Sequence, residues 1–150
     1  MENMIRYNAN ICVNFYGQIA KKKRIEAYVK NVIRYFCPNI RRVINVDIYV
    51  KNKLDCPETY AYCYGNRKHI EIELKRMSHD FMMLNLAHEL VHAKQYLTGQ
   101  LSPTLQKWKS EDYSHVAYSR TPWEREAYRK EDWIWKNFWL EVDSDPHFLV

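Results

Sequence analysis

The segment SHDFMMLNLAHELVHAKQYLTGQ, residues 78–100, decides how the rest of the chain is interpreted. Its apolar residues recur at helical spacing over more than five turns. The helix is expected to begin near Ser78 or Asp80, both of which are good N-caps. Gly99 is a good C-terminal cap, because glycine readily adopts the left-handed backbone that ends many helices. We therefore expect one long helix in the middle of the chain.

This helix contains an HExxH pattern formed by His88, Glu89 and His92. Positions four apart lie on the same face of a helix, so the two imidazoles can bind one metal ion together. Glu89 points to the side of that pair, where it can polarise a metal-bound water and accept its proton. Because short HExxH matches also arise by chance, the context of the pattern matters.

The predicted helix is apolar on two sides. The histidines lie opposite the main apolar stripe, next to Leu84 and Val91, whereas a surface helix is normally polar there. The helix is therefore expected between two layers. Buried histidines need partners, and a shared metal ion satisfies both. A metal site is the preferred interpretation over a chance or purely structural pair. The main stripe consists of Met83, Leu86, Leu90, Ala93 and Leu97.

A catalytic zinc site usually needs a third protein ligand, and the downstream candidates are His115, Glu124 and Glu126. The two glutamates differ by about 200° around a helix, so both cannot face one metal ion. Thr121 and Glu124 also fit a capping box, in which Glu124 would bond back to the start of its own helix. In that case Glu126 would be the carboxylate left to act as the third metal ligand.

Two short segments together carry a resemblance to a known class of proteins. HELVHAKQY, residues 88–96, followed by PWEREAY, residues 122–128, resembles the gluzincin class of zinc metallopeptidases. In particular, it resembles small predicted metallopeptidases of phages and bacteria that pair an HELxH helix with a PWExEA segment. The similarity covers roughly residues 85–128, and the paired motifs are much more specific than HExxH alone.

The resemblance implies a role for each matching residue. His88, His92 and Glu124 would be the ligands of a zinc ion (Zn2+), and Glu89 would be the general base. Ala127 would be the small residue that lets the two helices approach each other closely. On this basis Glu124 is preferred to Glu126 as the third ligand.

Two further residues have open roles. Related peptidases often carry an acidic residue directly after the small one, where it orients a ligand histidine, but Tyr128 occupies that position here. We expect Tyr128 to pack, with contact to a ligand or to an oxyanion as the alternative. His115 is expected to be an ordinary polar loop residue, with substrate contact as the alternative.

The whole chain, residues 1–150, is expected to form a single α+β domain of the zincin type. A small antiparallel or mixed sheet and an N-terminal helix would pack on the HExxH helix, and a Trp-rich helix would close the other side. Residues 100–120 look irregular. The other expected elements are a strand or helix start at 11–16, a helix at 18–36, a strand at 46–50, a hairpin of 59–64 and 68–74, and a Trp-rich helix from Thr121 to about Leu140.

The composition is that of a globular protein, with 47% hydrophobic residues, 27% charged residues and a net charge of +5. No apolar run is long enough to span a membrane, and the N-terminus lacks a signal-peptide pattern. We therefore expect a cytoplasmic protein, in a host cell if the chain is phage-encoded. The four cysteines contain no CxxC pair and are interpreted as small core residues.

These features predict a zinc metallopeptidase that acts on a protein or peptide substrate. The resemblance implies that the strand before the metal-binding helix, residues 69–74, is a sheet edge, which could bind an extended peptide as an extra strand. The alternative is a non-catalytic, zinc-stabilised module that binds nucleic acid or protein through its basic surface. No membrane partner is expected. The oligomeric state and the cleavage specificity do not follow from the sequence.

Overall fold

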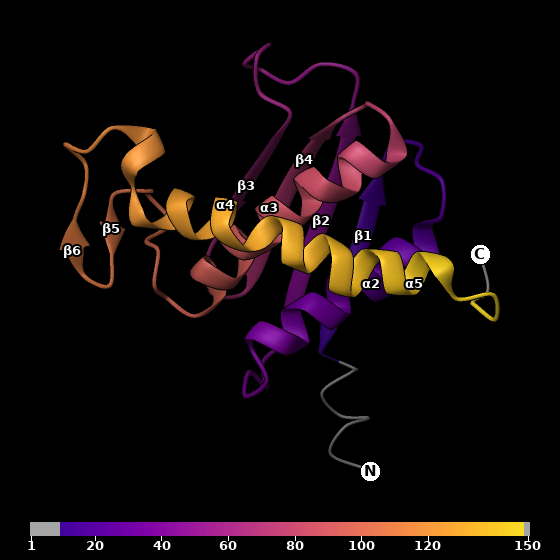
Figure 1. The fold of residues 1–150 in the computed structure, drawn as a ribbon. Coiled ribbons are helices and arrows are strands. Elements are labelled where there is room, and N and C mark those ends of the chain that lie inside the picture. The colour runs from indigo at the N-terminus through magenta and orange to yellow at the C-terminus, as the bar shows by residue number, and fades with distance from the viewer. Residues whose placement is uncertain (1–9, 149–150) are drawn as a thin grey trace.

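A four-stranded mixed sheet forms the base of the fold in the computed structural model, which describes residues 10–148 (Figure 1). The strand order is β1-β2-β4-β3; the first three are parallel, and β3 runs antiparallel to β4. The N-terminal segment is expected to contain no signal peptide, and its residues 1–9 lie outside the described residues. The strands are β1 (Ile11–Tyr16), β2 (Ile44–Lys51), β3 (Ala61–Gly65) and β4 (His69–Lys75).

Alternating side chains place one face of the sheet in the core. In β2 and β4 every second residue is buried, and Ile70, Ile72 and Leu74 of β4 are fully buried, as the alternation predicts. The turn between β3 and β4 is closed by Asn66, whose side-chain oxygen accepts hydrogen bonds from the backbone amides of Lys68 and His69. The predicted hairpin is therefore confirmed.

The position of β4 differs from the expectation. Residues 69–74 were expected to form an edge strand, but β4 lies between β2 and β3, which makes that prediction wrong. One side of β4 pairs in parallel with β2, a partner distant in sequence, and the hairpin arm β3 covers the other side. The edge strand next to the HExxH helix is therefore β3.

The helices cover one face of the sheet (Figure 1). The HExxH helix α3 (His79–Leu97) contacts β3 and β4 on one side and α4 (Pro122–Ile134) on the other, and α2 (Lys22–Phe36) packs beside it. All five residues of the predicted apolar stripe are fully buried, as is Val91 on the opposite side. Gly99 follows the helix with φ +77°, in the left-handed region. The expected placement of α3 between two layers is confirmed.

The C-terminal helix is longer than expected and changes geometry along its length. After α4, a π-helical turn at Trp135–Trp139 leads into α5 (Leu140–Ser144). Trp123 and Trp139 are buried in the core, whereas Trp133 is 46% exposed. Some aromatic residues of the Trp-rich helix are thus core residues, as expected, whereas others are exposed.

Residues 100–120 are mostly irregular, as expected, but contain a two-residue ladder between β5 (Lys107–Trp108) and β6 (Glu111–Asp112). Of the four cysteines, Cys12 and Cys56 are exposed, so interpreting all four as core residues was wrong. No helix in the described part of the chain is both long and apolar enough to cross a membrane. The fold is α+β, with one main hydrophobic core between sheet and helices.

Candidate metal centre

Two packed helices bring the paired motifs together. Helices α3 and α4 pack against each other, and Ala127 of α4 is fully buried, as a small residue at a close helix contact would be. One turn earlier on α4, the 2% exposed Glu124 faces the two histidines of α3. The Nε2 atom of His88 lies 2.6 Å from Glu124 Oε1, and that of His92 lies 3.2 Å from Oε2.

These three side chains have the donor set and the spacing of a zinc site. One ligand atom from each lies within 4.8 Å of the other two. The ligand atoms of a tetrahedral zinc lie about 3.3 Å apart, so small side-chain adjustments would accommodate the ion. Although Glu124 Oε2 is buried, it accepts no well-aligned hydrogen bond from the described residues. Two imidazole nitrogens and a carboxylate with an unsatisfied buried oxygen fit a metal ion.

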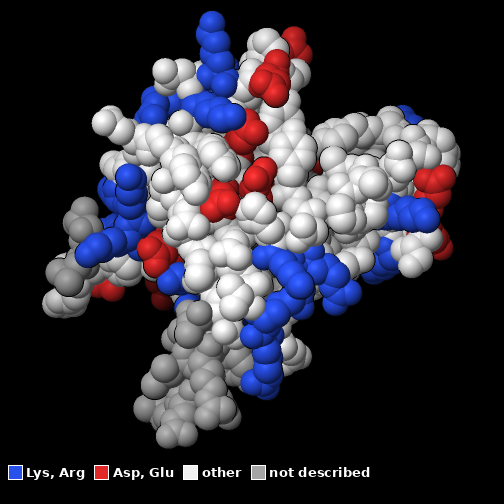
Figure 2. Space-filling model, turned by 180° about the vertical axis from the view of Figure 1, so that it is seen from behind, with Lys and Arg blue, Asp and Glu red and all other residues white. Residues whose placement is uncertain are grey.

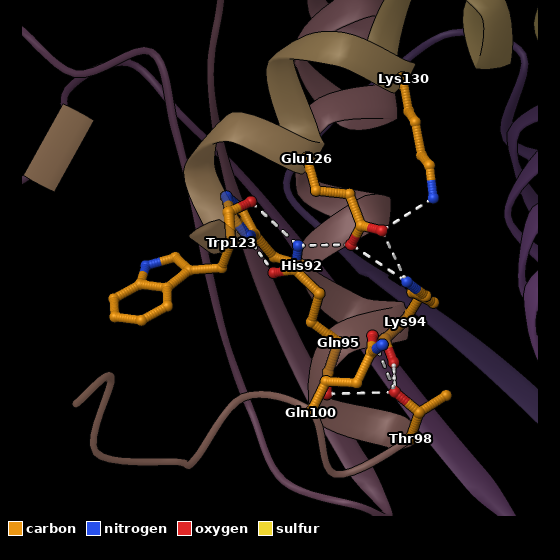
Figure 3. Close-up of polar contacts among 8 residues, drawn as sticks. All are labelled: His92, Lys94, Gln95, Thr98, Gln100, Trp123, Glu126 and Lys130. Carbon is orange, nitrogen blue, oxygen red and sulfur yellow. Dashed lines mark hydrogen bonds and ion pairs between the residues drawn. The ribbon is translucent and has the colours of Figure 1, made fainter. Parts of the chain in front are cut away.

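The ring nitrogen of His92 that faces away from Glu124, Nδ1, contacts a side-chain amide. His92 Nδ1 lies 2.8 Å from Gln95 Oε1, while Gln95 Nε2 donates to Trp123 O and to Glu126 Oε1, both at 2.9 Å (Figure 3). Because both Nε2 protons are used in this way, the oxygen of Gln95 is the atom that faces His92. The proton of a neutral His92 is therefore on Nδ1, which leaves the lone pair of Nε2 directed at Glu124.

The ring nitrogen of His88 that faces away from Glu124, Nδ1, contacts a carboxylate. This carboxylate was not predicted from the sequence. His88 Nδ1 lies 3.3 Å from Glu131 Oε1, so Glu131 can accept the Nδ1 proton and leave Nε2 free as a ligand. The resemblance placed an acidic residue of this kind directly after Ala127, where Tyr128 stands. Glu131 lies seven residues after Glu124, on the same face of α4, and that spacing was the available signal.

The capping-box alternative for Glu124 is not realised. Thr121 is the N-cap of α4, but its hydroxyl donates to Tyr118 O at 2.8 Å, and the helix start has no side-chain cap. The Glu124 carboxylate faces away from its own helix start, toward His88 and His92.

Glu126 lies on a different face of α4 and is held by cations. It accepts hydrogen bonds from Lys94 Nζ at 2.9 Å, from Lys130 Nζ at 2.8 Å and from Gln95 (Figure 3). Burial alone would raise its pKa, but the bonds from Lys130, Gln95 and Lys94 outweigh burial and lower the pKa to about 2. Glu126 therefore acts as a structural anion that ties α4 to α3.

The histidines and Glu124 form a strongly coupled set of charges. Burial alone would lower the pKa of His88, but contacts with Glu124 and Glu131 outweigh it and raise the pKa to about 10. The pKa of His92 is also raised, by Glu124 and Glu89, against the effect of burial. Burial alone would raise the pKa of Glu124, but its contacts with His88 and His92 outweigh burial and hold the pKa well below its usual value. Without metal, protons thus balance the carboxylate charge.

Glu89 lines a cleft of about 590 Å³ and is only 7% exposed. Burial raises its pKa, and the nearby His92 and His88 oppose that shift. The cleft lies between the edge strand β3 on one side and α3 and α4 on the other. The candidate ligands His88, His92 and Glu124 thus share one accessible cavity with Glu89.

Tyr128 and His115 differ in their distance from this cluster. The Tyr128 ring packs edge-on against His88, with centroids 4.7 Å apart, and lines the cleft. His115 is exposed and does not line the cleft. A second tyrosine, Tyr118, also lines the cleft and is largely exposed. Tyr118 gave no sequence signal, because it lies in the segment without regular periodicity.

A second group of possible ligands lies on the sheet face that the helices leave open. His69 Nε2 is 2.7 Å from Asp47 Oδ2, and an oxygen of Glu71 completes a set within 4.8 Å. From behind, acidic side chains gather near the middle of the molecule and lysines and arginines lie mainly around them (Figure 2). His69 is 41% exposed, so hydration competes with metal binding there, and the cluster between the helices is the stronger candidate.

Comparisons with protein-family models, with curated proteins and with solved structures found no significant match. The resemblance to gluzincins therefore rests on the paired motifs alone.

Proposed function

We propose that the protein is a zinc metallopeptidase of the gluzincin type. The observation that carries this proposal is the convergence of two imidazole nitrogens on the buried Glu124 carboxylate, with Glu89 beside them in an open cleft. The opposite ring nitrogens are both directed at acceptors, Gln95 and Glu131. This arrangement supports a catalytic rather than a purely structural site, because three protein ligands leave one zinc position for water or substrate.

His88, His92 and Glu124 would hold the ion, with Nε2 of each imidazole as the ligand atom. When bound, zinc polarises the scissile carbonyl and lowers the pKa of its water toward about 7. Gln95 and Glu131 keep the two rings in the tautomer that presents Nε2 to the metal. These contacts fix the ring planes before the substrate arrives.

Glu89 would be the general base and then the general acid. Its carboxylate lies next to both ligand histidines and lines the cleft. During attack it takes the proton of the water, and it then delivers that proton to the nitrogen of the leaving amine. A buried carboxylate has few competing water contacts, so its proton transfer is directed to the reacting groups.

The edge strand β3 gives the cleft a means to bind an extended peptide. β4 covers only one side of β3, and residues of β3 line the cleft opposite α3. A peptide added to the free edge would pair with the β3 backbone and present its carbonyls toward the metal cluster. β3 thus takes the role that the sequence suggested for residues 69–74.

The decisive test compares zinc content and proteolysis in wild type and Glu89→Gln. Both proteins are expected to contain about one zinc per chain, and only wild type is expected to cleave a quenched fluorogenic peptide library. Glu141→Gln removes a carboxylate from exposed α5, outside the cleft, and serves as the matched control. Equal cleavage by wild type and Glu89→Gln would overturn the proposal.

A further inference from the structure

We propose that the cleft selects peptides with a cationic nitrogen group near the scissile bond, either a Lys or Arg side chain or a free amino terminus. As a statement about cleavage, this rests on the proposed peptidase function. As a statement about binding, it rests on the charges and rings that line the cleft.

The charges of the molecule are segregated. Lys and Arg outnumber Asp and Glu by 23 to 18 in the chain, yet none of the described Lys or Arg residues lines the cleft. Four carboxylates do line it: Glu58, Glu89, Glu124 and Glu131. A basic protein thus has an acidic cleft, and such a cleft concentrates cations.

A bound divalent ion does not remove this negative charge. Its two positive charges would balance Glu89 and Glu124, while Glu131 contacts a histidine that is neutral when it binds metal. Glu131 and Glu58 then remain as uncompensated anions. The walls of the cleft have low polarisability compared with water, so the field of these anions is less screened than at an open surface.

Glu58 is the carboxylate that is free to meet a substrate. It is exposed in the loop before β3 and forms no ion pair with any described residue. Two tyrosines that also line the cleft, Tyr118 and Tyr128, are largely exposed, so their rings are accessible to a substrate cation.

The test measures peptide binding to Glu89→Gln, which is not expected to cleave, both with and without added zinc. The probes are an acetylated, amidated alanine hexapeptide with one central Arg and its counterpart with citrulline, the neutral isostere of Arg. The unsubstituted hexapeptide, with a free or an acetylated amino terminus, tests the second source of the cation. Isothermal titration calorimetry gives each Kd at 20 mM and 300 mM salt.

We expect the Arg or the free-amine peptide to bind about tenfold more tightly than its neutral counterpart at low salt, with a smaller ratio at high salt. Adding Glu58→Gln should reduce the ratio about threefold, while adding Glu141→Gln should leave it unchanged. Equal Kd values for charged and neutral peptides would overturn the inference.

The outcomes also separate this inference from the proposed function. Cleavage by wild type without a preference for cationic peptides leaves the peptidase standing and overturns cation selection. A charge preference in binding, without zinc or cleavage, supports cation selection and overturns the peptidase.

Discussion

Two faces of α4 carry glutamates only two residues apart, and these glutamates lie in opposite chemical settings. Glu124 faces two histidines across a contact with α3, and Glu126 faces Lys94 and Lys130. Both carboxylates are buried, and both have a lowered pKa. The shared shift therefore does not distinguish the two roles.

The partners make the difference. Lysines stay protonated throughout the neutral range, so the ion pairs of Glu126 are permanent. The contacts of Glu124 depend on protons held by His88 and His92, and a metal ion can replace those protons. The comparison indicates that an exchangeable partner, more than burial or a shifted pKa, distinguishes a candidate metal ligand from a structural carboxylate.

The largest expected effect concerns activity on the Glu124 face. Glu89→Gln should lower kcat/KM for peptide cleavage by at least about a thousandfold, because the base is lost while the zinc ligands remain. Glu126→Gln should stay within about threefold of wild type in the same assay. If Glu126→Gln were as inactive as Glu89→Gln, the assignment of a purely structural role to the Glu126 face of α4 would be contradicted.

A smaller effect is expected for the residue behind His88. Glu131→Gln should weaken zinc affinity about tenfold to a hundredfold, because an amide holds the His88 ring less firmly than a carboxylate does. Competition with a fluorescent chelator gives the Kd, and Glu141→Gln is the control. An unchanged Kd would show that the 3.3 Å contact between Glu131 and His88 has no role in holding the metal.

On the other face, the expected effect is on stability. Glu126→Gln should lower the free energy of unfolding by about 2 kcal/mol at pH 7, since Lys94 and Lys130 lose a carboxylate partner. The folded pKa of about 2 lies below the usual 4.5, so the contribution is complete above pH 4.5 and is lost as the pH falls toward 2. Urea unfolding at several pH values checks this; a difference between the two proteins that stays constant down to pH 2.5 would contradict it.

The smallest effect is expected at Tyr128. Its ring packs on His88 but is 64% exposed, and none of the hydrogen bonds found among the described residues involves its hydroxyl. Tyr128→Phe should therefore change kcat/KM by less than about threefold. A loss of a hundredfold or more, with zinc retained, would instead give the hydroxyl a role in the reaction.

Local periodicity was enough to predict most of the elements. The boundaries of α3, the burial of its two apolar sides and the β3–β4 hairpin follow from spacing and turn residues within a few turns of chain. The strand order did not follow, because the parallel pairing of β2 with β4 joins segments about 24 residues apart and leaves no local pattern. The edge strand was misassigned for that reason.

The candidate site was predicted to a similar extent. His88, Glu89 and His92 come from one local motif, and Glu124 comes from the resemblance of a second motif. Their approach in space depends on the packing of α3 against α4. Gln95, Glu131 and Tyr118 were missed, because their roles depend on which way a side chain points after the helices have packed.

The most direct test of the account is the zinc content per chain of untagged protein, measured by elemental mass spectrometry. Wild type and Glu126→Ala are expected to contain about one zinc, whereas Glu124→Ala should lose most of it. His69→Ala, which removes the exposed histidine of the second cluster, should also keep its zinc. Zinc retained in Glu124→Ala but lost in Glu126→Ala or His69→Ala would contradict the assignment of the metal centre.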